Sequence, residues 1–372
     1  MELYYTIHIL VFLCCLFEFT KTSIKTKKKI IIFWCLFFTL FGGLRWRIGG
    51  DWNQYFDHYL FSNWNNIFNY DRYGNGQEQL EPLFVFLNVL IKSIFGDFYW
   101  YNLIVCGFIQ YTIYHFCCKY SPTQPLLLYA WIIVATFNYF PVRSGLAMSI
   151  GWWSFKYIQE QKLKQFLIVS FLAFSIHHQC IILFPLYWVG KIRINFILYS
   201  IIYISLILIS NQIQSFITTL SITTGGDIAE KAYKYTQVET EGYTGSSYMS
   251  WGLNYFLTSV FYWVGKQKNL LHNRWYNTLI NTNLIYMSIF IVFSEGMGDL
   301  TRLASVVVPA FLILFITALH YFLTNRKRGY HILAISFFLL YYGYKFAQIG
   351  QGYFFKEVNV PYTTIFDFNI LN

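Results

Sequence analysis

Residues 303–323 read LASVVVPAFLILFITALHYFL, a stretch without a charged residue. A helix needs roughly 20 apolar residues to cross a bilayer, or roughly 17 when flanking side chains reach the interface. Segments of about this size recur along the chain at 3–19, 30–44, 99–118, 125–141, 143–159, 163–177, 179–193, 195–210, 251–265, 276–293 and 331–347. We therefore expect an all-α integral membrane protein with about 12 transmembrane helices.

The composition favours a single polytopic membrane domain over residues 1–372. Hydrophobic residues make up 56% of the chain and charged residues 12%, which is about half the charged fraction of a soluble domain. The net charge of +10 lies in short runs between apolar segments rather than in a basic stripe, which argues against a nucleic-acid partner. The seven cysteines lie within apolar segments and form no CxxC motif, so neither a metal site nor a disulfide framework is expected.

The basic runs indicate which helix ends face the cytoplasm. They are Lys21–Lys29, Lys156–Lys164, Lys191–Arg193, Lys266–Arg274 and Arg326–Arg328. If all of them are cytoplasmic, an even number of spans must separate each consecutive pair. Between the first and second runs, one further apolar segment at 82–95 makes the number odd. Because this segment is short and contains Lys92, we expect a re-entrant half-helix that lines a cavity beside residues 45–81.

This topology places both termini and the longest connections on the outer side of the membrane. The outer segments are 45–81, 211–250, 294–302 and the tail from about 348. Of the 17 Asp and Glu residues, all but Glu18 and Glu160 then lie outside. We expect 45–81 to contribute to an active site. Residues 211–250, in which Tyr235 suits stacking against a sugar, form either a lid or a plain hydrophilic loop.

Four arginines lie near predicted helix ends on the outer side: Arg45, Arg47, Arg143 and Arg302. Ionisable residues at this depth are costly and are usually either paired or functional. One interpretation pairs Arg45 or Arg47 with Asp51, and Arg302 with Asp299 or Glu295. The other, favoured by four arginines on one face, is an anionic ligand. A diphosphate headgroup of a lipid carrier fits, because its oxygens match guanidinium forks.

Three residues on the same face are candidates for activating a hydroxyl group: Asp51, Glu81 and His177. Each has an alternative structural role. Asp51 can cap a helix over 52–60, Glu81 before Pro82 is typical of a helix start, and a histidine at a hairpin turn is often a hydrogen-bonded interface residue. No P-loop, GxSxG, HExxH, DxD or dinucleotide motif occurs in a usable context, which argues against nucleotide-driven transport, serine hydrolysis and zinc chemistry.

Several short blocks follow one another in the order found in a known family. They are Arg47-Ile-Gly-Gly-Asp51-Trp-Asn-Gln-Tyr55, Glu81-Pro-Leu-Phe84, Arg143-Ser-Gly-Leu-Ala147, Lys162-Leu-Lys164, His177, Lys234-Tyr235, Arg302 and Pro361-Tyr362. On these blocks the chain resembles the EpsG/Wzy-type family of bacterial polysaccharide polymerases over nearly its whole length. It departs from that pattern at Ile176, where the family has an aromatic residue before the histidine. The resemblance implies a membrane glycosyltransferase of GT-C-like architecture that needs no metal or other cofactor.

The resemblance also implies a reaction and a place for it. A glycan linked to undecaprenyl diphosphate would be transferred to a hydroxyl of another lipid-linked repeat unit, at the outer leaflet of the bacterial cytoplasmic membrane. The four arginines would hold the diphosphate and Tyr235 the glycan, while Asp51, Glu81 or His177 would activate the hydroxyl. The expected partners are the lipid-linked oligosaccharide and membrane lipid, with a chain-length regulator and a flippase. Two rival functions remain open: a flippase of the same lipid-linked oligosaccharide, and an O-antigen-ligase-like transferase that uses a different acceptor.

Overall fold

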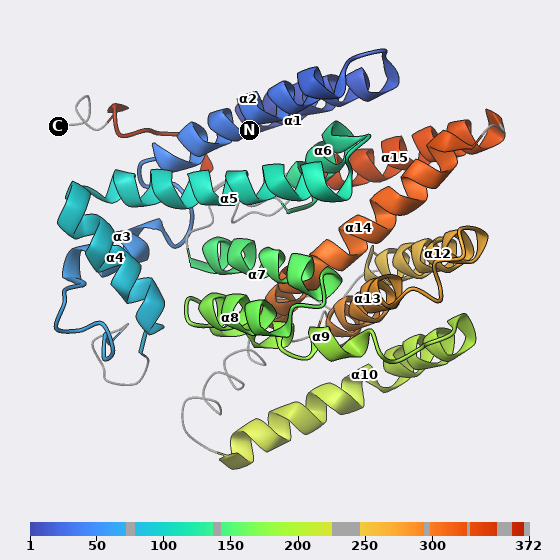
Figure 1. Cartoon of the computed structure of the whole chain (residues 1–372). Coiled ribbons are helices and arrows are strands. Elements are labelled where there is room, and N and C mark those ends of the chain that lie inside the picture. Colours follow the sequence, from blue (N-terminus) through green and yellow to red (C-terminus); the bar gives the residue numbers. More distant parts are fainter. Residues whose placement is uncertain are drawn as a thin grey trace.

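The chain folds into a layered array of helices (Figure 1). The computed structural model describes residues 1–71, 79–136, 143–224, 246–293, 298–325, 328–347 and 359–367. Within these ranges the regular elements are all helical: α1 (Glu2–Cys15), η1 (Leu16–Phe19), α2 (Ile24–Gly43), α3 (Trp52–Phe61), α4 (Pro82–Phe95), α5 (Phe98–Tyr120), α6 (Pro125–Thr136), α7 (Arg143–Gln159), α8 (Leu163–Phe174), η2 (His178–Leu183), α9 (Leu186–Val189), α10 (Phe196–Thr224), α12 (Ser246–Gln267), α13 (Arg274–Phe293), η3 (Gly298–Thr301), α14 (Arg302–Thr324) and α15 (Arg328–Ala347). The predicted all-α class is confirmed.

Several helices are suited to cross a membrane. By length and composition, four of the described helices qualify: Glu2–Phe19, Phe196–Thr219, Arg274–Phe293 and Arg302–Thr324. A fifth span is added if the bent pair α4 and α5 is taken as one. This agrees with a multi-pass membrane protein, whereas the total of about 12 spans and the GT-C-like architecture stay predictions.

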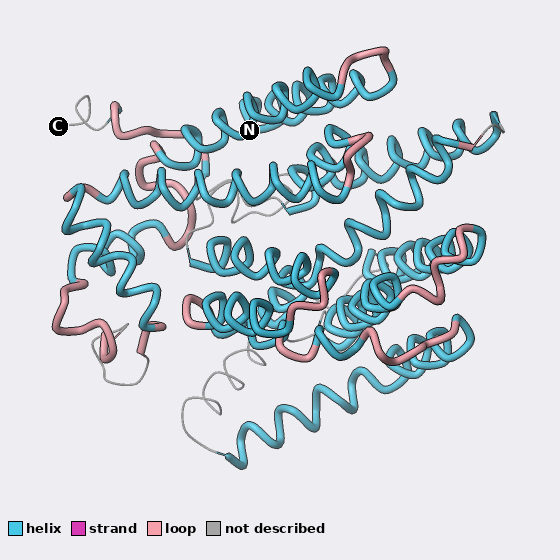
Figure 2. The backbone as a smooth tube through the Cα atoms, in the orientation of Figure 1, coloured by secondary structure: helices cyan, strands magenta, loops and turns pink. Residues whose placement is uncertain are grey.

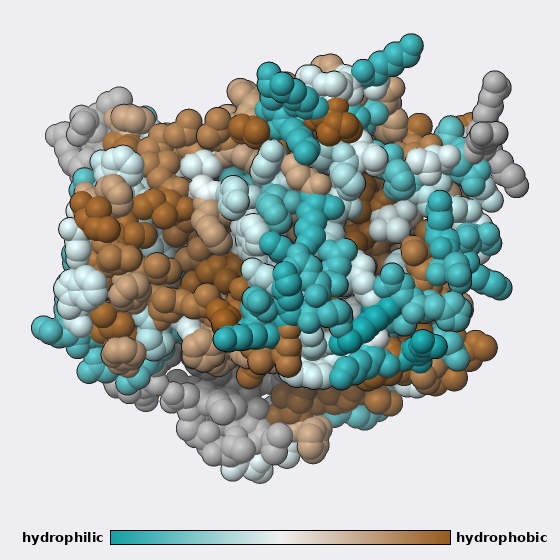
Figure 3. Space-filling view, in the orientation of Figure 1, coloured by the Kyte–Doolittle hydropathy of each residue, from teal (hydrophilic) through white to brown (hydrophobic). Residues whose placement is uncertain are grey.

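The two ends of the helices differ in character. The adjoining ends of α1 and α2 and of α12 and α13 lie on the right of Figures 1 and 2, and the basic runs Lys21–Lys29 and Lys266–Arg274 are at these ends. The helices α3 and α4 and the start of α5 lie on the left (Figure 1). Hydrophilic residues gather over the middle and right of the surface, where α5, α7 and α12 end, and hydrophobic residues cover much of the left (Figure 3). We call this side of the molecule, where α5, α7 and α12 end and where the runs Lys21–Lys29 and Lys266–Arg274 lie, the basic end.

The segment 82–95 forms a helix of its own. Pro82 is the first residue of α4, a position where the missing N–H of proline costs nothing. Gly96 has φ 82°, a conformation that favours glycine, and α5 then starts at an angle of 119° to α4. Such a bend is typical of a broken span or a re-entrant loop. The separate helix agrees with the sequence, and the re-entrant course stays a prediction.

Lys92 lies in this apolar helix because it has backbone partners. Its Nζ donates to the carbonyl oxygens of Leu60, at 2.5 Å, and Ser62, at 3.2 Å. Both carbonyls lie at the C-terminal end of α3, where the last carbonyl groups of a helix have no partner within it. The lysine therefore joins α4 to α3 rather than facing lipid.

The expected apolar span at 179–193 is not one helix. The 3₁₀ helix η2 ends at Leu183, and the four-residue α9 follows Pro185, which has no backbone N–H to extend the helical hydrogen bonds. η2 packs close to α7 at Gly151, where a Cβ atom would lie 2.9 Å from Leu183 Cδ1. This segment therefore fills the space beside α7 and α8 instead of forming a regular span. The predicted outer connection 211–250 is also shorter, because α10 continues to Thr224 and α12 begins at Ser246.

A C-terminal strap, residues 359–367, crosses the end of α2. Its backbone pairs with the segment after α2: Trp46 N donates to Thr363 O, and Ile365 N donates to Leu44 O, each at 3.0 Å. Thr363 Oγ1 also donates to Trp46 O at 2.6 Å. The strap thus fixes the start of the predicted outer segment 45–81.

Aromatic packing and a local cap hold the strap in place. The ring of Tyr362 stacks on Phe41 with centroids 4.3 Å apart, and its hydroxyl donates to Phe41 O. Asp367 Oδ2 accepts from the backbone N–H of Thr364 at 2.6 Å and from its hydroxyl at 2.8 Å. These donors hold the pKa of Asp367 below its ordinary value, so the cap is charged at neutral pH.

Candidate functional site

A buried carboxylate begins the site. Glu81 occupies the N-cap position of α4, but its side chain makes no capping hydrogen bond. Its carboxylate is 4% exposed, and Oε2 lies 2.8 Å from Arg143 Nη1. The helix start predicted at Glu81–Pro82 is therefore correct. The side chain, however, is committed to an arginine 62 residues away in the sequence.

Arg143 is the first residue of α7, and its side chain is 9% exposed. The guanidinium lies over the ring of Phe84, 5.9 Å from the centroid, one turn into α4. Its Nε is buried and has no hydrogen-bond partner among the described residues. A buried donor of this kind costs roughly 1–3 kcal/mol, and more when charged, so an oxygen that accepts from it would be bound favourably.

Two histidines complete the surroundings of Glu81. The backbone N–H of His178 donates to Glu81 Oε1 at 3.1 Å. The Nδ1 atoms of His177 and His178 lie 4.0 and 3.7 Å from the same oxygen. His177 Nδ1 accepts from the backbone N–H of Gln179 at 3.3 Å, which assigns the ring proton of the neutral form to Nε2. The site therefore contains one ion pair whose carboxylate accepts on both oxygens, with two imidazoles beside it.

Arg45 lies apart from this pair, among tyrosines. It is 2% exposed, and its backbone forms a bridge with Thr364 of the strap. Its guanidinium interacts electrostatically with the phenols of Tyr4, Tyr55 and Tyr362. Among the described residues no ion pair joins Arg45 to Asp51, so the structure does not show that predicted pairing for Arg45.

Arg47 and Asp51 are both exposed and also form no ion pair with each other. Arg47 has φ 53°, a left-handed conformation unusual for a residue with a side chain, and Gly49 follows with φ 99°. Asp51 stands at the N-cap position of α3, as predicted, but makes no side-chain capping bond. The left-handed turn exposes the side chains of Arg47 and Asp51 at the protein surface, where they are available to a ligand.

The remaining predicted residues are only partly described. Arg302 is the exposed first residue of α14. Its suggested partners Glu295 and Asp299, and Tyr235 in the predicted lid, lie outside the described residues or side chains. In the described part of the chain no group of three His, Cys, Asp or Glu is placed to hold a metal ion.

Two buried polar side chains were not singled out from the sequence. Asn88, within α4, is fully buried, and both its Oδ1 and Nδ2 have no hydrogen-bond partner among the described residues. Tyr101, in α5, is also fully buried, and its hydroxyl has no hydrogen-bond partner among the described residues. The Tyr101 hydroxyl interacts electrostatically with both Tyr55 and Arg143. An asparagine inside the apolar run of α4 was the available signal.

Comparison with known proteins gives one family match. The model described as the EpsG family matches residues 28–364, a range that contains every candidate site residue named above. No curated protein matches the chain, and no solved structure does.

Proposed function

The chain belongs to the EpsG family, which points broadly to exopolysaccharide biosynthesis, and we propose on this premise that it is a polysaccharide polymerase. The proposed enzyme is a membrane glycosyltransferase that needs no metal. It transfers a glycan from undecaprenyl diphosphate to a hydroxyl of another lipid-linked repeat unit. About 12 spans in the bacterial cytoplasmic membrane, with the active face outside, belong to the same proposal.

The observation that carries the proposal is the buried Glu81–Arg143 pair with an unsatisfied Nε. Glu81 takes one corner of the guanidinium, Nη1, and holds the group in place at 2.8 Å. Nε and Nη2 form the opposite, two-pronged edge, which matches two oxygens of a phosphate. A departing diphosphate gains charge in the transition state, and a fixed guanidinium stabilises that charge without having to reorient.

In this proposal Glu81 is a positioning residue, because both of its oxygens already accept hydrogen bonds. Activation of the acceptor hydroxyl then falls to Asp51, which makes no capping bond, or to His177. Arg302, Arg45 and Arg47 add positive charge for the diphosphate, and Tyr235 would stack on the glycan.

The test is chain growth by the purified protein in liposomes with a lipid-linked repeat unit. Arg143→Lys keeps the charge but loses the two-pronged edge, and Arg302→Ala removes a charge from an exposed position. We expect each to slow chain growth by at least about tenfold, since one oxyanion-stabilising donor contributes on the order of 10²–10³ in rate. Arg193→Lys, at an exposed arginine of the basic end, is the matched control and is expected to grow chains normally.

The products separate the rival functions. A ladder of repeats supports the polymerase. Near-normal ladders from both variants would refute the assigned roles. Transfer of a single glycan to a different acceptor would instead identify a ligase, and movement of labelled lipid across the bilayer without chain growth a flippase.

A further inference from the structure

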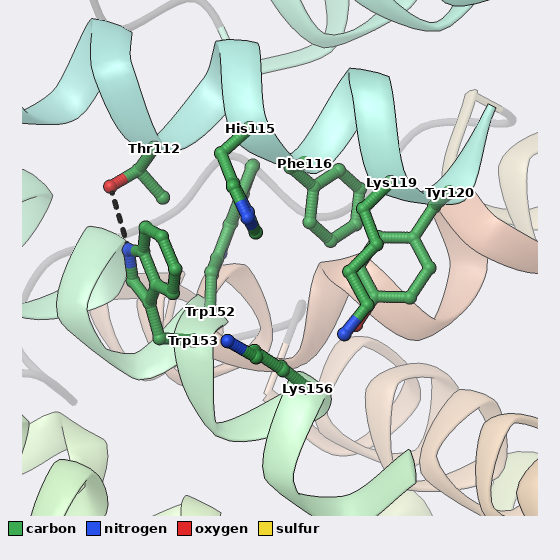
Figure 4. A pocket seen from close by; sticks show the side chains of 8 residues that line it. All are labelled: Thr112, His115, Phe116, Lys119, Tyr120, Trp152, Trp153 and Lys156. Carbon is green, nitrogen blue, oxygen red and sulfur yellow. Dashed lines mark hydrogen bonds between the residues drawn. The ribbon is translucent and has the colours of Figure 1, made fainter. Parts of the chain in front are cut away.

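A second cationic site lies at the basic end, between the last turns of α5 and α7 (Figure 4). His115 and Lys119 come from α5, and Trp153 and Lys156 from α7. In Figure 4 the side chains of His115, Lys119 and Lys156 point into the same gap between the two helices. The gap encloses only about 10 Å³, room for about one water molecule, so a larger group would sit at its mouth.

Aromatic rings contact the side chains of His115, Lys119 and Lys156. The ring of His115 stacks on Trp153 with centroids 4.3 Å apart, and Trp153 Nε1 donates to Thr112 Oγ1 at 3.1 Å. Lys156 Nζ lies 6.0 Å from the Trp153 ring centroid, and Lys119 Nζ lies 5.4 Å from that of Tyr120. The ammonium groups are therefore pre-positioned, which lowers the entropy lost when a ligand binds.

The positive charge exceeds the negative charge nearby. Among the described residues, the carboxylate that pairs here is Glu160, 3.8 Å from Lys119 but 2.9 Å from the exposed Lys162. The hydrogen bond from Lys162 lowers the pKa of Glu160, so Glu160 is charged at neutral pH and mainly neutralises Lys162. Lys119 is therefore only weakly neutralised by this carboxylate, and no described carboxylate forms an ion pair with Lys156.

From this gap, an exposed apolar stripe runs along α5 toward the start of that helix. Ile104 and Tyr111 lie 11 and 4 residues before His115, spacings that place all three on one face of α5. Ile104 is 41% exposed and Tyr111 is 55% exposed. The ring of Tyr111 stacks on Trp153 with centroids 6.1 Å apart. A stripe that faces lipid thus ends at two lysines, with aromatic residues of the kind found at membrane interfaces.

We propose that this site binds the phosphodiester headgroup of an anionic phospholipid, in the leaflet at the basic end, through Lys119 and Lys156. The acyl chains lie along the exposed stripe of α5, and the phosphate oxygens accept from the two ammonium groups. A lipid fits better than a soluble phosphate, because the apolar stripe adjoins the cations and would otherwise contribute nothing. The site is separate from the Glu81–Arg143 pair and does not depend on the proposed polymerase activity.

The test is lipid binding by the purified full chain, measured by native mass spectrometry after titration with dioleoyl phosphatidylglycerol. The variant Lys119→Gln/Lys156→Gln is expected to lose about 25-fold in affinity, roughly fivefold for each cation. Lys164→Gln/Lys191→Gln removes the same charge from exposed positions of the basic end and should bind as the original chain does. The single variants, expected to lose about fivefold each, serve if the double variant does not fold.

Further arms of the experiment identify the source of the phosphate. Dioleoyl phosphatidylcholine, which carries a compensating ammonium, should bind more weakly, and inorganic phosphate at millimolar concentration should not displace the anionic lipid. Unchanged affinity in the double and single variants would overturn the proposal. So would an equal loss in the control variant, or full displacement of the lipid by inorganic phosphate.

Discussion

Removing one member of the Glu81–Arg143 pair should harm the protein far more than removing both. Glu81 Oε2 lies 2.8 Å from Arg143 Nη1, and the two side chains are 4% and 9% exposed, respectively. Each charge is therefore stabilised by the other rather than by water. Arg143→Met leaves the Glu81 carboxylate buried without its cation, which costs about 3–5 kcal/mol. Glu81→Gln has the converse effect, although the new amide oxygen can still accept from the His178 N–H.

The double variant Glu81→Gln/Arg143→Met buries no net charge. We expect it to recover most of the loss and to fall within about 1–2 kcal/mol of the original protein, because replacing a whole buried ion pair is often close to neutral. Since each single loss is at least about 3 kcal/mol and the double loss at most about 2 kcal/mol, the coupling energy between the two positions should be at least about 4 kcal/mol.

The assay is equilibrium unfolding of all four proteins in mixed micelles of dodecyl maltoside and sodium dodecyl sulfate, with chain growth measured in parallel. If the proposed function is right, the double variant is stable but inactive, since the guanidinium is gone. A coupling energy below about 0.5 kcal/mol would refute the energetic reasoning. A stable double variant with normal chain growth would show that the pair is purely structural.

Two further predictions concern packing. Gly43→Ala should destabilise the protein by about 1–3 kcal/mol, because its Cβ would lie 2.8 Å from Leu103 Cα where α2 meets α5. Gly252→Ala, inside α12 with nothing within 4 Å, is the control and should stabilise the protein by up to about 1 kcal/mol in the same unfolding assay. Tyr362→Ala should release the C-terminal strap and speed amide hydrogen exchange in residues 44–46 at least about tenfold, because about 1.4 kcal/mol of stacking is lost. Tyr362→Phe keeps the stack on Phe41 and should keep most of the protection, so equal exchange in the two variants would contradict this prediction.

Local patterns in the sequence were sufficient to predict most of the helices. Apolar length predicted α5, α13 and α14 to within a few residues, and the parity of the basic runs singled out 82–95 as a separate element. These features depend on hydropathy and on Pro82 and Gly96, which act through neighbouring residues only. The positions of these helices could therefore be predicted, because residues adjacent in the sequence determine them.

Partners distant in sequence could not be predicted in the same way. Glu81 was expected to act through its own helix or as a base, yet it pairs with Arg143, because burying either charge alone would be too costly. Lys92 weakened the case for a membrane span at 82–95, and its bond to Leu60 O, which joins α4 to α3, was not foreseen. Arg45 was matched to the nearest carboxylate, whereas its side chain is buried and its backbone forms a bridge with Thr364 of the strap. Each of these contacts requires knowledge of which helices become neighbours.

The strap has a consequence for how the protein matures. Thr363 and Trp46 are separated by 317 residues, so the segment that carries Arg45 and Arg47 lacks its backbone partners while nearly all of the chain is being made. At about 5–20 residues per second, a ribosome needs on the order of 15–60 s to cover that distance. During that interval the newborn chain already contains its first helices, but the segment after α2 has no strap to pair with. Arrival of the strap therefore completes the backbone pairing of this segment only at the end of synthesis.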